Sequence, residues 1–185
     1  MYAIGGRVYG ADDVSLLNKC ERFNMETRKW EIIADMNVNR CTSTAFLFRN
    51  EIYVFGGYTS RYKRSKKIEK YNELKDNWEV IDLKLYSGFE NGNVVASPIP
   101  NRILILGGKL NYGSSKNVWE YDLIEKTVVN KSPIFENGIL TKYFRSSDDT
   151  IYIFGQSEET NPLKYYVEQY DVHAYRNLNE DIHLL

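Results

Sequence analysis

The stretch Glu51–Ser60, EIYVFGGYTS, contains an uninterrupted apolar run that ends on two adjacent glycines. A short run without polar alternation is typical of a strand that is covered on both faces. Glycine allows a positive φ, or a close approach of a neighbouring backbone, where a side chain would clash. The stretch therefore predicts a buried inner strand that leaves a crowded centre at Gly56 and Gly57.

The same pattern occurs four times along the chain. The other copies are MYAIGG at 1–6, RILILGG at 102–108 and TIYIFGQ at 150–156. The first glycines of the four copies are separated by 51, 51 and 48 residues. Self-similarity at a fixed period of this size indicates a repeat architecture.

A second motif, an aromatic residue followed by Asn or Asp, keeps the same period. Its copies are Phe23-Asn24, Tyr71-Asn72, Tyr121-Asp122 and Tyr170-Asp171, with the aromatic residues 48, 50 and 49 positions apart. A tryptophan follows seven residues later in the first two copies, at Trp30 and Trp78. The later copies have Val128 and Asn177 there, so this third element weakens toward the C-terminus.

Together these motifs resemble the kelch repeat, whose period is about 50 residues. The resemblance covers residues 1 to about 178. It implies an all-β fold, a kelch-type β-propeller of about four blades, each a sheet of four antiparallel strands a to d. The periodic glycines and aromatic residues are then scaffold, and we expect the aromatic ones to pack between blades. This structural set is Gly5, Gly6, Gly56, Gly57, Gly107, Gly108, Gly155, Phe23, Tyr71, Tyr121, Tyr170, Trp30 and Trp78.

The strands of three blades can be placed from the sequence. In the second repeat we expect them at 41–48, 51–57, 66–72 and 77–83, with a hairpin turn at Arg49-Asn50. In the third we expect 93–98, 102–108, 117–123 and 127–131, and in the fourth 139–145, 150–156, 165–172 and 174–178. The prediction is a single kelch-repeat domain over 1–185, with repeats at approximately 1–40, 41–90, 91–137 and 138–185.

The first blade is expected to be incomplete, because its pattern begins at strand b. Kelch propellers generally close with five to seven blades, so the resemblance leaves this chain short of a ring. Three explanations stay open: the chain is part of a longer kelch protein and a larger propeller, it assembles with another chain, or residues 178–185 supply the innermost strand of the first blade.

Composition excludes several classes of partner and compartment. The chain has 185 residues and a formal net charge of −1, which favours neither nucleic acid nor an anionic membrane as a partner. Its two cysteines, Cys20 and Cys41, form no CxxC motif and predict a reducing compartment. The N-terminal residues have no apolar signal region, and no apolar run approaches 18 residues. We therefore predict a cytoplasmic location.

No catalytic constellation is recognisable, so we predict no enzyme activity, no metal and no cofactor. The chain has two histidines, His173 and His183, too few for a zinc site with the two cysteines. No nucleophile elbow or phosphate loop occurs. The alternative from another class is a copper-dependent oxidase of the galactose oxidase type, a propeller enzyme that would use two histidines and two tyrosines.

A binding function fits the pattern better, since recognition residues collect on loops of a rigid scaffold. In a propeller the b–c loops and the d–a links emerge on one face, and the b–c loops here are long: 7–18, 58–66, 109–116 and 157–164. Exposed tyrosines and a basic loop on this face predict a protein or peptide partner, acidic in character. The predicted partner-binding residues are Tyr9, Asp12, Asp13, Tyr58, Arg61, Tyr62, Lys63, Arg64, Lys66, Asn111, Tyr112, Glu158 and Glu159.

The family resemblance implies the kind of work such a face does. Kelch modules act as adaptors or scaffolds, for instance with a ubiquitin-ligase or a cytoskeletal component. The remaining alternative is a truncated kelch fragment with no binding activity of its own.

Overall fold

The computed structural model describes residues 1–10, 14–60, 63–82, 88–110, 113–134, 139–145, 150–156 and 165–170. These residues form strands and turns and contain no helix, which confirms the all-β prediction. The chain divides into two compact units, Met1–Asn91 and Gly92–Leu185. The boundary falls where the second predicted repeat gives way to the third.

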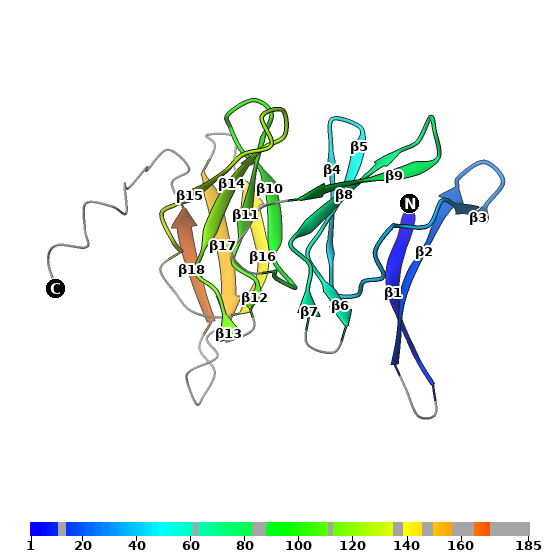
Figure 1. Ribbon diagram of the computed structural model, residues 1–185. Helices are drawn as coiled ribbons and strands as arrows, with labels where there is room; N and C mark the ends of the chain where they lie inside the picture. The colour runs from blue at the N-terminus through cyan, green and yellow to red at the C-terminus, as the bar shows by residue number, and fades with distance from the viewer. Residues whose placement is uncertain are drawn as a thin grey trace, which may run out of the picture. The chain divides into compact units, whose positions relative to one another are not determined.

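Unit 1 contains two antiparallel sheets and a small hairpin (Figure 1). The first sheet has the order β1-β2-β3, with strands Tyr2–Tyr9, Val14–Asn24 and Lys29–Ile33. The second has the order β4-β5-β8-β9, with strands Thr44–Phe48, Glu51–Phe55, Lys67–Asn72 and Asn77–Asp82. Strands β6 (Tyr58–Ser60) and β7 (Lys63–Arg64) pair between β5 and β8 in the sequence.

Unit 2 repeats this plan. Its first sheet has the order β10-β11-β14-β15, with strands Asn93–Ala96, Arg102–Leu106, Val118–Asp122 and Val128–Lys131. Strands β12 (Lys109–Leu110) and β13 (Gly113–Ser114) form the corresponding hairpin. The other sheet has the order β16-β17-β18, with strands Ile139–Arg145, Ile151–Gln156 and Tyr165–Tyr170. Each of the four main sheets has the antiparallel plan predicted for a propeller blade, and we number them blades one to four in chain order.

Most predicted strands agree with the structure to within a few residues. The first strand of blade two starts at Thr44 rather than at residue 41, because Cys41 pairs instead with Tyr58 in an isolated bridge. The Arg49-Asn50 turn is present, with φ of 51° and 63° at the two residues, as a two-residue hairpin with the favoured twist requires. The strand predicted at 174–178 lies outside the described residues.

Blade one differs from the prediction in the segment 7–18, which we expected to be a loop. In the structure residues 7–9 and 14–18 form the outer part of a long hairpin, in which Tyr9 pairs with Val14 and Val8 with Ser15. Val and Tyr favour extended, paired backbone, so the strands continue past the glycines instead of ending there. The register shifts between Ile4 and Gly6, where Gly5 takes a φ of 63°.

At the glycine pairs of blades one and two, the backbone of another chain segment crosses in direct contact with the glycines. A Cβ on Gly56 would lie 2.4 Å from the carbonyl oxygen of Phe89, and Gly56 has a φ of 60°. The N–H of Gly57 donates to that same carbonyl at 2.7 Å. The pair therefore combines a left-handed backbone with a contact that no side chain could allow. In blade one the carbonyl of Arg40 takes the place of Phe89.

The Asn or Asp after the first three periodic aromatic residues closes the following turn. Its side-chain oxygen accepts hydrogen bonds from backbone N–H groups two or three residues further on, which is an Asx turn. The acceptors are Asn24, Asn72 and Asp122. The last residue of each turn has a positive φ, at Arg28, Asp76 and Lys126.

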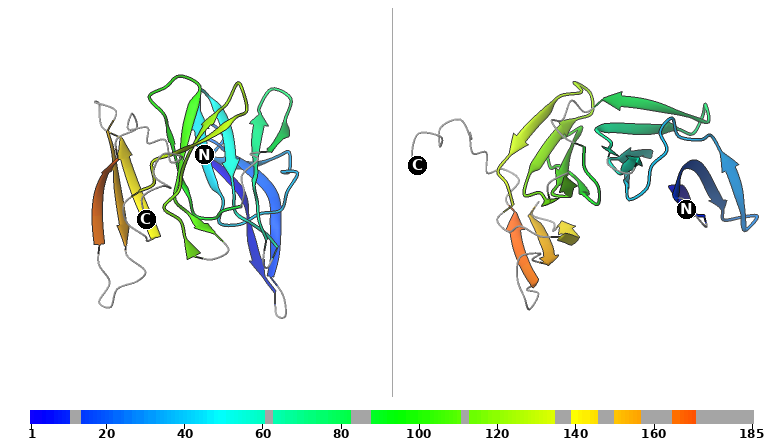
Figure 2. Two further views of the ribbon diagram at one scale, coloured as in Figure 1. Left: turned by 60° about the vertical axis from the view of Figure 1, so that its left-hand side comes forward. Right: turned by 60° about the horizontal axis from the view of Figure 1, so that its bottom comes forward.

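Within each unit the two main sheets stack face to face (Figures 1 and 2). In unit 1 the buried cluster includes Cys20 and Ile33 from blade one and Val54, Tyr71 and Trp78 from blade two. The indole N–H of Trp78 donates to the carbonyl of Ala34 at 2.8 Å. Adjacent sheets thus share one core.

Blade four packs in the same way in unit 2. Its Ile151, Ile153 and Tyr170 share a cluster with Leu106 and Val118 of blade three, among others. The hydroxyl of Tyr170 donates to the carbonyl of Ser132. Tyr121 is also fully buried.

Blade one is the exception among the periodic aromatic residues. Phe23 and Trp30 contact each other edge to face, with ring centroids 5.3 Å apart, but both belong to this one sheet. Trp30 is exposed, which differs from the expected packing between blades.

Candidate functional site

In unit 1 the outer part of the β1–β2 hairpin and the β6–β7 hairpin project from the same end of the sheets (Figure 1). The link between the two sheets, residues 34–43, makes backbone hydrogen bonds to both hairpins. The N–H of Arg40 donates to Leu17 at 2.9 Å, and Cys41 exchanges two backbone hydrogen bonds with Tyr58, at 3.1 and 2.9 Å. We call the surface formed by these two hairpins and the adjoining link the loop face.

Four side chains join the β6–β7 hairpin to Thr42, which precedes the second sheet, and to Glu90, which follows it. The guanidinium of Arg64 donates to Glu90 Oε1 at 2.8 Å and to the hydroxyl of Tyr58 at 2.8 Å. Its Cζ also lies 4.7 Å from the centroid of the Tyr58 ring. Thr42 donates to the other carboxylate oxygen of Glu90 at 3.1 Å. Arg64 and Glu90 are almost completely buried, so this is a closed framework.

This framework changes the role predicted for two residues. The charge of Arg64 is neutralised by Glu90 and withdrawn from solvent, so Arg64 is a supporting residue and not an open cation of the rim. Tyr58 is only partly exposed. Burial, together with the neighbouring Glu90 carboxylate, raises the pKa of Tyr58, which keeps its hydroxyl protonated.

Other predicted residues do face solvent. Lys63 and Lys66 are exposed on either side of Arg64. Tyr9 is exposed near the end of the β1–β2 hairpin, and the guanidinium of Arg7 lies 4.9 Å from its ring centroid. The remaining predicted binding residues lie outside the described part of the chain: Asp12, Asp13, Arg61, Tyr62, Asn111, Tyr112, Glu158 and Glu159.

The hairpin end adds three residues that sequence reasoning missed. Val8 and Val14 are exposed beside Tyr9, and Arg7 stacks on it. The signal was Val8 and Tyr9 before segment 10–13 and Val14 after it, residue types that favour a strand pair over a loop. The last described residues of the hairpin are thus apolar and aromatic, with an attached cation.

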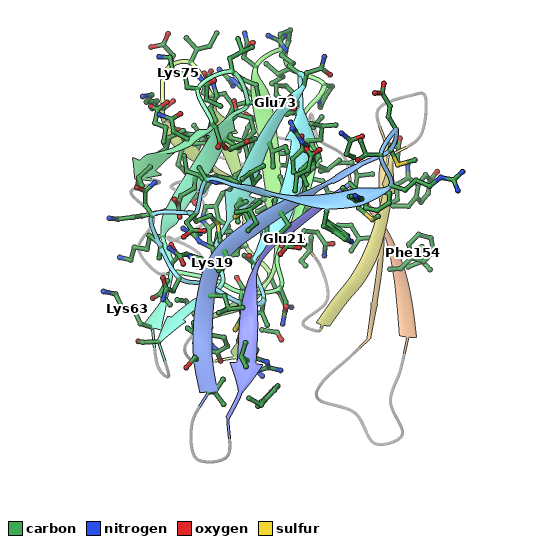
Figure 3. All side chains as sticks on the ribbon, turned by 90° about the vertical axis from the view of Figure 1, so that its right-hand side faces the viewer. Lys19, Glu21, Lys63, Glu73, Lys75 and Phe154 are labelled. Carbon is green, nitrogen blue, oxygen red and sulfur yellow. The ribbon has the colours of Figure 1, made fainter. Side chains whose placement is uncertain are left out.

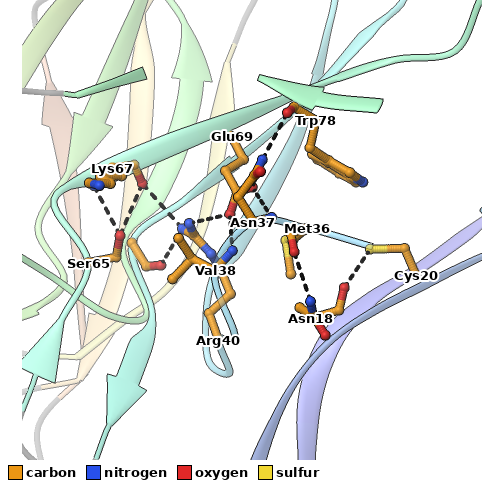
Figure 4. Close-up of polar contacts among 11 residues, drawn as sticks. Asn18, Cys20, Met36, Asn37, Val38, Arg40, Ser65, Lys67, Glu69 and Trp78 are labelled. Atoms are coloured by element: carbon orange, nitrogen blue, oxygen red, sulfur yellow. Dashed lines mark hydrogen bonds and ion pairs between the residues drawn. The ribbon is translucent and has the colours of Figure 1, made fainter. Parts of the chain in front are cut away.

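A buried ion pair anchors the link behind the loop face (Figure 4). Arg40 Nη2 donates to Glu69 Oε1 at 2.8 Å, and neither side chain is exposed. The same guanidinium donates to the carbonyl of Gly56 at 2.9 Å. Glu69 also accepts backbone N–H bonds from Asn37 at 2.6 Å and Val38 at 3.1 Å. Sequence reasoning named neither Arg40 nor Glu69. Arg40 has no counterpart at the repeat period, whereas a Glu two residues before the periodic aromatic residue also occurs as Glu21 and Glu168 and was a signal that could have found Glu69.

Burial lowers the pKa of the Arg40 guanidinium, and the Glu69 carboxylate opposes that effect. The Nε of Arg40 has no hydrogen-bond partner, although the two terminal nitrogens are paired. The pair is a structural clamp that holds the link against strand β8.

The described residues contain no group of three or more His, Cys, Asp and Glu side chains that could hold a metal ion. Cys20 and Cys41 are buried free thiols, and burial raises the pKa of Cys20. His173 and His183, which the copper-oxidase alternative would need, lie outside the described residues. The described part of the chain has no helix that is long and apolar enough to cross a membrane.

Residues 1–37 and 39–82 match the family model of the kelch motif. A RING finger domain and kelch repeat-containing protein of Dictyostelium discoideum is 37% identical over 83 residues, which is 44% of this chain and 8% of that protein. Kelch-like protein 15 of Gallus gallus is 25% identical over 123 residues, which is 66% of this chain and 24% of that protein. The chain therefore spans about a quarter or less of these relatives.

The fold is similar to that of the solved structure of YjhT, with a TM-score of 0.73. The superposition covers 90% of this chain and 63% of that one. Because the sequence identity is 13%, this likeness concerns the fold alone.

Proposed function

We propose, because this chain is a kelch-repeat protein, that it is a non-catalytic adaptor or scaffold module that binds another protein through the loop face. The coarse part of this function, protein interaction, is the general one for kelch repeats. The finer part, the loop face and its residues, is argued from the geometry of unit 1.

The observation that carries the proposal is the exposed tip of the β1–β2 hairpin. It presents Val8, Tyr9 and Val14 to solvent, with Arg7 stacked on the tyrosine. Tyrosine offers a large contact area at low entropic cost and is frequent at the centre of protein interfaces. Large apolar residues grouped at the end of a hairpin cost solubility unless a partner covers them.

The second support is the rigidity of the surface beside this tip. The framework of Thr42, Tyr58, Arg64 and Glu90 holds β6–β7 in one conformation through charged hydrogen bonds. A preorganised surface loses less conformational entropy when a partner binds. The framework thus suits a recognition surface without itself contacting the partner.

We further propose an acidic partner segment. Lys63 and Lys66 are exposed next to the neutralised Arg64, and Arg7 adds a third exposed cation on the hairpin. Such groups pair with carboxylates or phosphates and raise association rates. A ubiquitin-ligase role is a proposal that rests on the RING finger named in one relative. A cytoskeletal role rests on the family resemblance alone.

The proposal is tested by affinity capture with three immobilised baits: the wild-type chain, a Tyr9→Ala/Lys63→Glu/Lys66→Glu variant, and a Leu74→Ala variant. Leu74 is exposed in the turn between β8 and β9, away from both hairpins, and serves as the matched control. We expect a protein that the wild-type and Leu74→Ala baits retain and the triple variant loses. Equal retention by all three baits contradicts the loop face, and no specific retention by any bait contradicts the binding function.

The acidic preference has its own test. A fluorescent glutamate-rich peptide and a serine-rich peptide of the same length are titrated with the chain and followed by polarisation. Binding of the acidic peptide alone, weakened by salt and by Lys63→Glu/Lys66→Glu, is the expected result. Equal binding of both peptides contradicts an acidic partner.

A further inference from the structure

Thr42 lies in the link of the loop face and has a backbone conformation that its residue type disfavours. Its φ is 53°, in the left-handed region. A β-branched side chain crowds the backbone there, whereas Gly and Asn adopt this region readily. Strained residues of this kind persist where the surrounding structure fixes them, and they gather at functional sites. The outlier therefore asks what the side chain of Thr42 contributes.

The following link has a residue type that tolerates the same conformation. Thr42 and Asn91 are equivalent, because each lies two residues after the link carbonyl that accepts the N–H of the second glycine of a pair. Asn91 has a φ of 51°. The sequence FENG of residues 89–92 recurs at 135–138, so the repeat has Asn at this position twice and Thr once. A left-handed turn alone thus requires no β-branched residue.

The hydroxyl of Thr42 provides what the turn does not require. It donates to Oε2 of Glu90 at 3.1 Å, while the guanidinium of Arg64 donates to Oε1 at 2.8 Å. Glu90 is 4% exposed, so protein groups and not bulk water orient its carboxylate. Arg64 in turn donates to the hydroxyl of Tyr58 at 2.8 Å. The four side chains form one chain of hydrogen bonds from the link to the β6–β7 hairpin.

Backbone contacts on both sides hold Thr42 in its strained conformation. Its carbonyl accepts the N–H of Asn91 at 3.1 Å. The preceding residue, Cys41, exchanges two backbone hydrogen bonds with Tyr58, at 3.1 and 2.9 Å. The left-handed turn therefore allows Thr42 to contact the next link through its carbonyl and Glu90 through its hydroxyl.

We infer that Thr42 is a positioning residue of the loop face, whose hydroxyl orients Glu90 and through it Arg64, Tyr58 and the β6–β7 hairpin. The hydrogen bond to the buried carboxylate offsets the strain of the backbone. That the positioned hairpin is a recognition surface rests on the proposed function. Figure 3 shows Lys63 on this hairpin at one end of unit 1, and Glu73 and Lys75 in the turn after β8 at the other end.

Two substitutions separate the hydroxyl from the branched shape. Thr42→Val keeps the shape and the strain but removes the hydroxyl, and Thr42→Ser keeps the hydroxyl but removes one branch. Leu74→Ala, in the turn between Glu73 and Lys75, is the matched control. Circular dichroism establishes that each variant is folded, and Thr42→Ala takes the place of Thr42→Val if that variant does not fold.

The first measurement is hydrogen exchange of the full chain. The N–H groups of Cys41 and Tyr58 report on the hairpin, and their exchange is taken relative to that of strand β5, so that a global loss of stability cancels. In Thr42→Val they should exchange about tenfold faster, as expected for the loss of one hydrogen bond to a charged group. Thr42→Ser and Leu74→Ala should match the wild type. Unchanged relative exchange in Thr42→Val overturns the inference.

The second measurement is the affinity for the glutamate-rich peptide. Thr42→Val should bind it more weakly, by up to about tenfold, because an unfixed hairpin must be ordered on binding. Thr42→Ser should bind as the wild type does. Faster exchange with unchanged affinity overturns the positioning role and makes Thr42 a structural residue only. A wild-type chain that binds no peptide counts against the proposed acidic partner alone, since the exchange measurement still decides whether Thr42 orients the hairpin.

Thermal melts test the strain itself. Thr42→Ser should melt about 2–4 °C above the wild type, because it removes a branch from a left-handed residue. Asn91→Thr adds a branch at the equivalent position and should lower the melting temperature by a similar amount. A Thr42→Ser variant that melts below the wild type, together with an unchanged Asn91→Thr, would overturn the claim that the hydroxyl offsets strain.

Discussion

Blade two places Glu69 two residues before Tyr71, whereas blade three places Trp119 two residues before Tyr121. Glu69 is fully buried in its ion pair with Arg40, and Trp119 is buried too. Position 40 is itself matched by Phe89, since the carbonyls of both residues accept the N–H of the second glycine of a pair. Charged residues in one repeat thus correspond to aromatic residues in the next.

The same two blades also exchange the charges of a second ion pair. In blade two, Glu51 pairs with Lys70 at 2.6 Å, and in blade three the equivalent residues are Arg102 and Glu120, paired at 3.1 Å. The acid and the base have changed places. The comparison teaches that the repeat preserves burial and pairing at each position, while the chemistry that provides them can change.

The largest expected effect comes from breaking the buried pair of blade two. Glu69→Gln keeps the shape but leaves the Arg40 guanidinium buried without a counter-charge, which should lower the free energy of unfolding by about 3–5 kcal/mol. Urea denaturation of the full chain measures it. A loss below about 1 kcal/mol would mean that the pair is not the clamp described here.

The aromatic residues of blade three can also be placed at the equivalent positions of blade two. The double variant Arg40→Phe/Glu69→Trp removes both charges together, so no charge is left buried and unpaired. It should be closer to the wild type in stability than Glu69→Gln is. A double variant less stable than the single one would show that the aromatic solution is specific to blade three.

A smaller loss is expected at the glycine crossing. In Gly56→Ala the new Cβ would meet the Phe89 carbonyl at 2.4 Å in a left-handed backbone, so the free energy of unfolding should fall by more than about 2 kcal/mol. Gly113→Ala is the control, because Gly113 also has a positive φ but no atom within 4 Å of the Cβ site. Equal losses in the two variants, measured by thermal melts, would mean that the loss comes from the positive φ alone and not from the contact with Phe89.

The turn after strand β8 should make the chain sensitive to acid. Hydrogen bonds from the N–H of Ala34 and the hydroxyl of Tyr71 lower the pKa of Asp76. A carboxyl whose folded pKa lies below its unfolded value stabilises the fold above about pH 4, and this is lost as the pH falls through the folded pKa. Asp76→Asn should therefore show a smaller drop in melting temperature between neutral and acidic pH. An unchanged drop would assign the acid sensitivity to other carboxylates.

The smallest effect is expected from the partly exposed Glu51–Lys70 pair. Glu51→Lys sets two cations against each other and should cost less than about 1 kcal/mol, since exposed ion pairs contribute little. The double variant Glu51→Lys/Lys70→Glu copies the blade-three arrangement and should recover most of that loss. A double-mutant cycle on thermal melts compares the two, and no recovery would mean that the charges do not interact.

Periodicity made the fold predictable. The glycine pairs, the aromatic residues and the Asn or Asp after them recur near every 50 residues, and they placed the strands of blades two and three to within a few residues. Recurrence could not reveal the framework of the loop face. Arg64 and Glu90 are 26 residues apart and occur once, so no repeat signal links them. Arg64 was consequently predicted as an open cation, although Glu90 neutralises it.

The sequence by itself determined the all-β class, the repeat boundaries and the crowded crossing at each glycine pair, because these depend on local backbone chemistry that recurs. Only the tertiary structure decided which side chains are exposed. Trp30 and Trp78 have the same local motif, yet one is exposed and the other is buried, since burial depends on a neighbouring sheet that local sequence does not encode. The pairing of Arg40 with Glu69 has the same origin, because it joins a link to a strand 29 residues away.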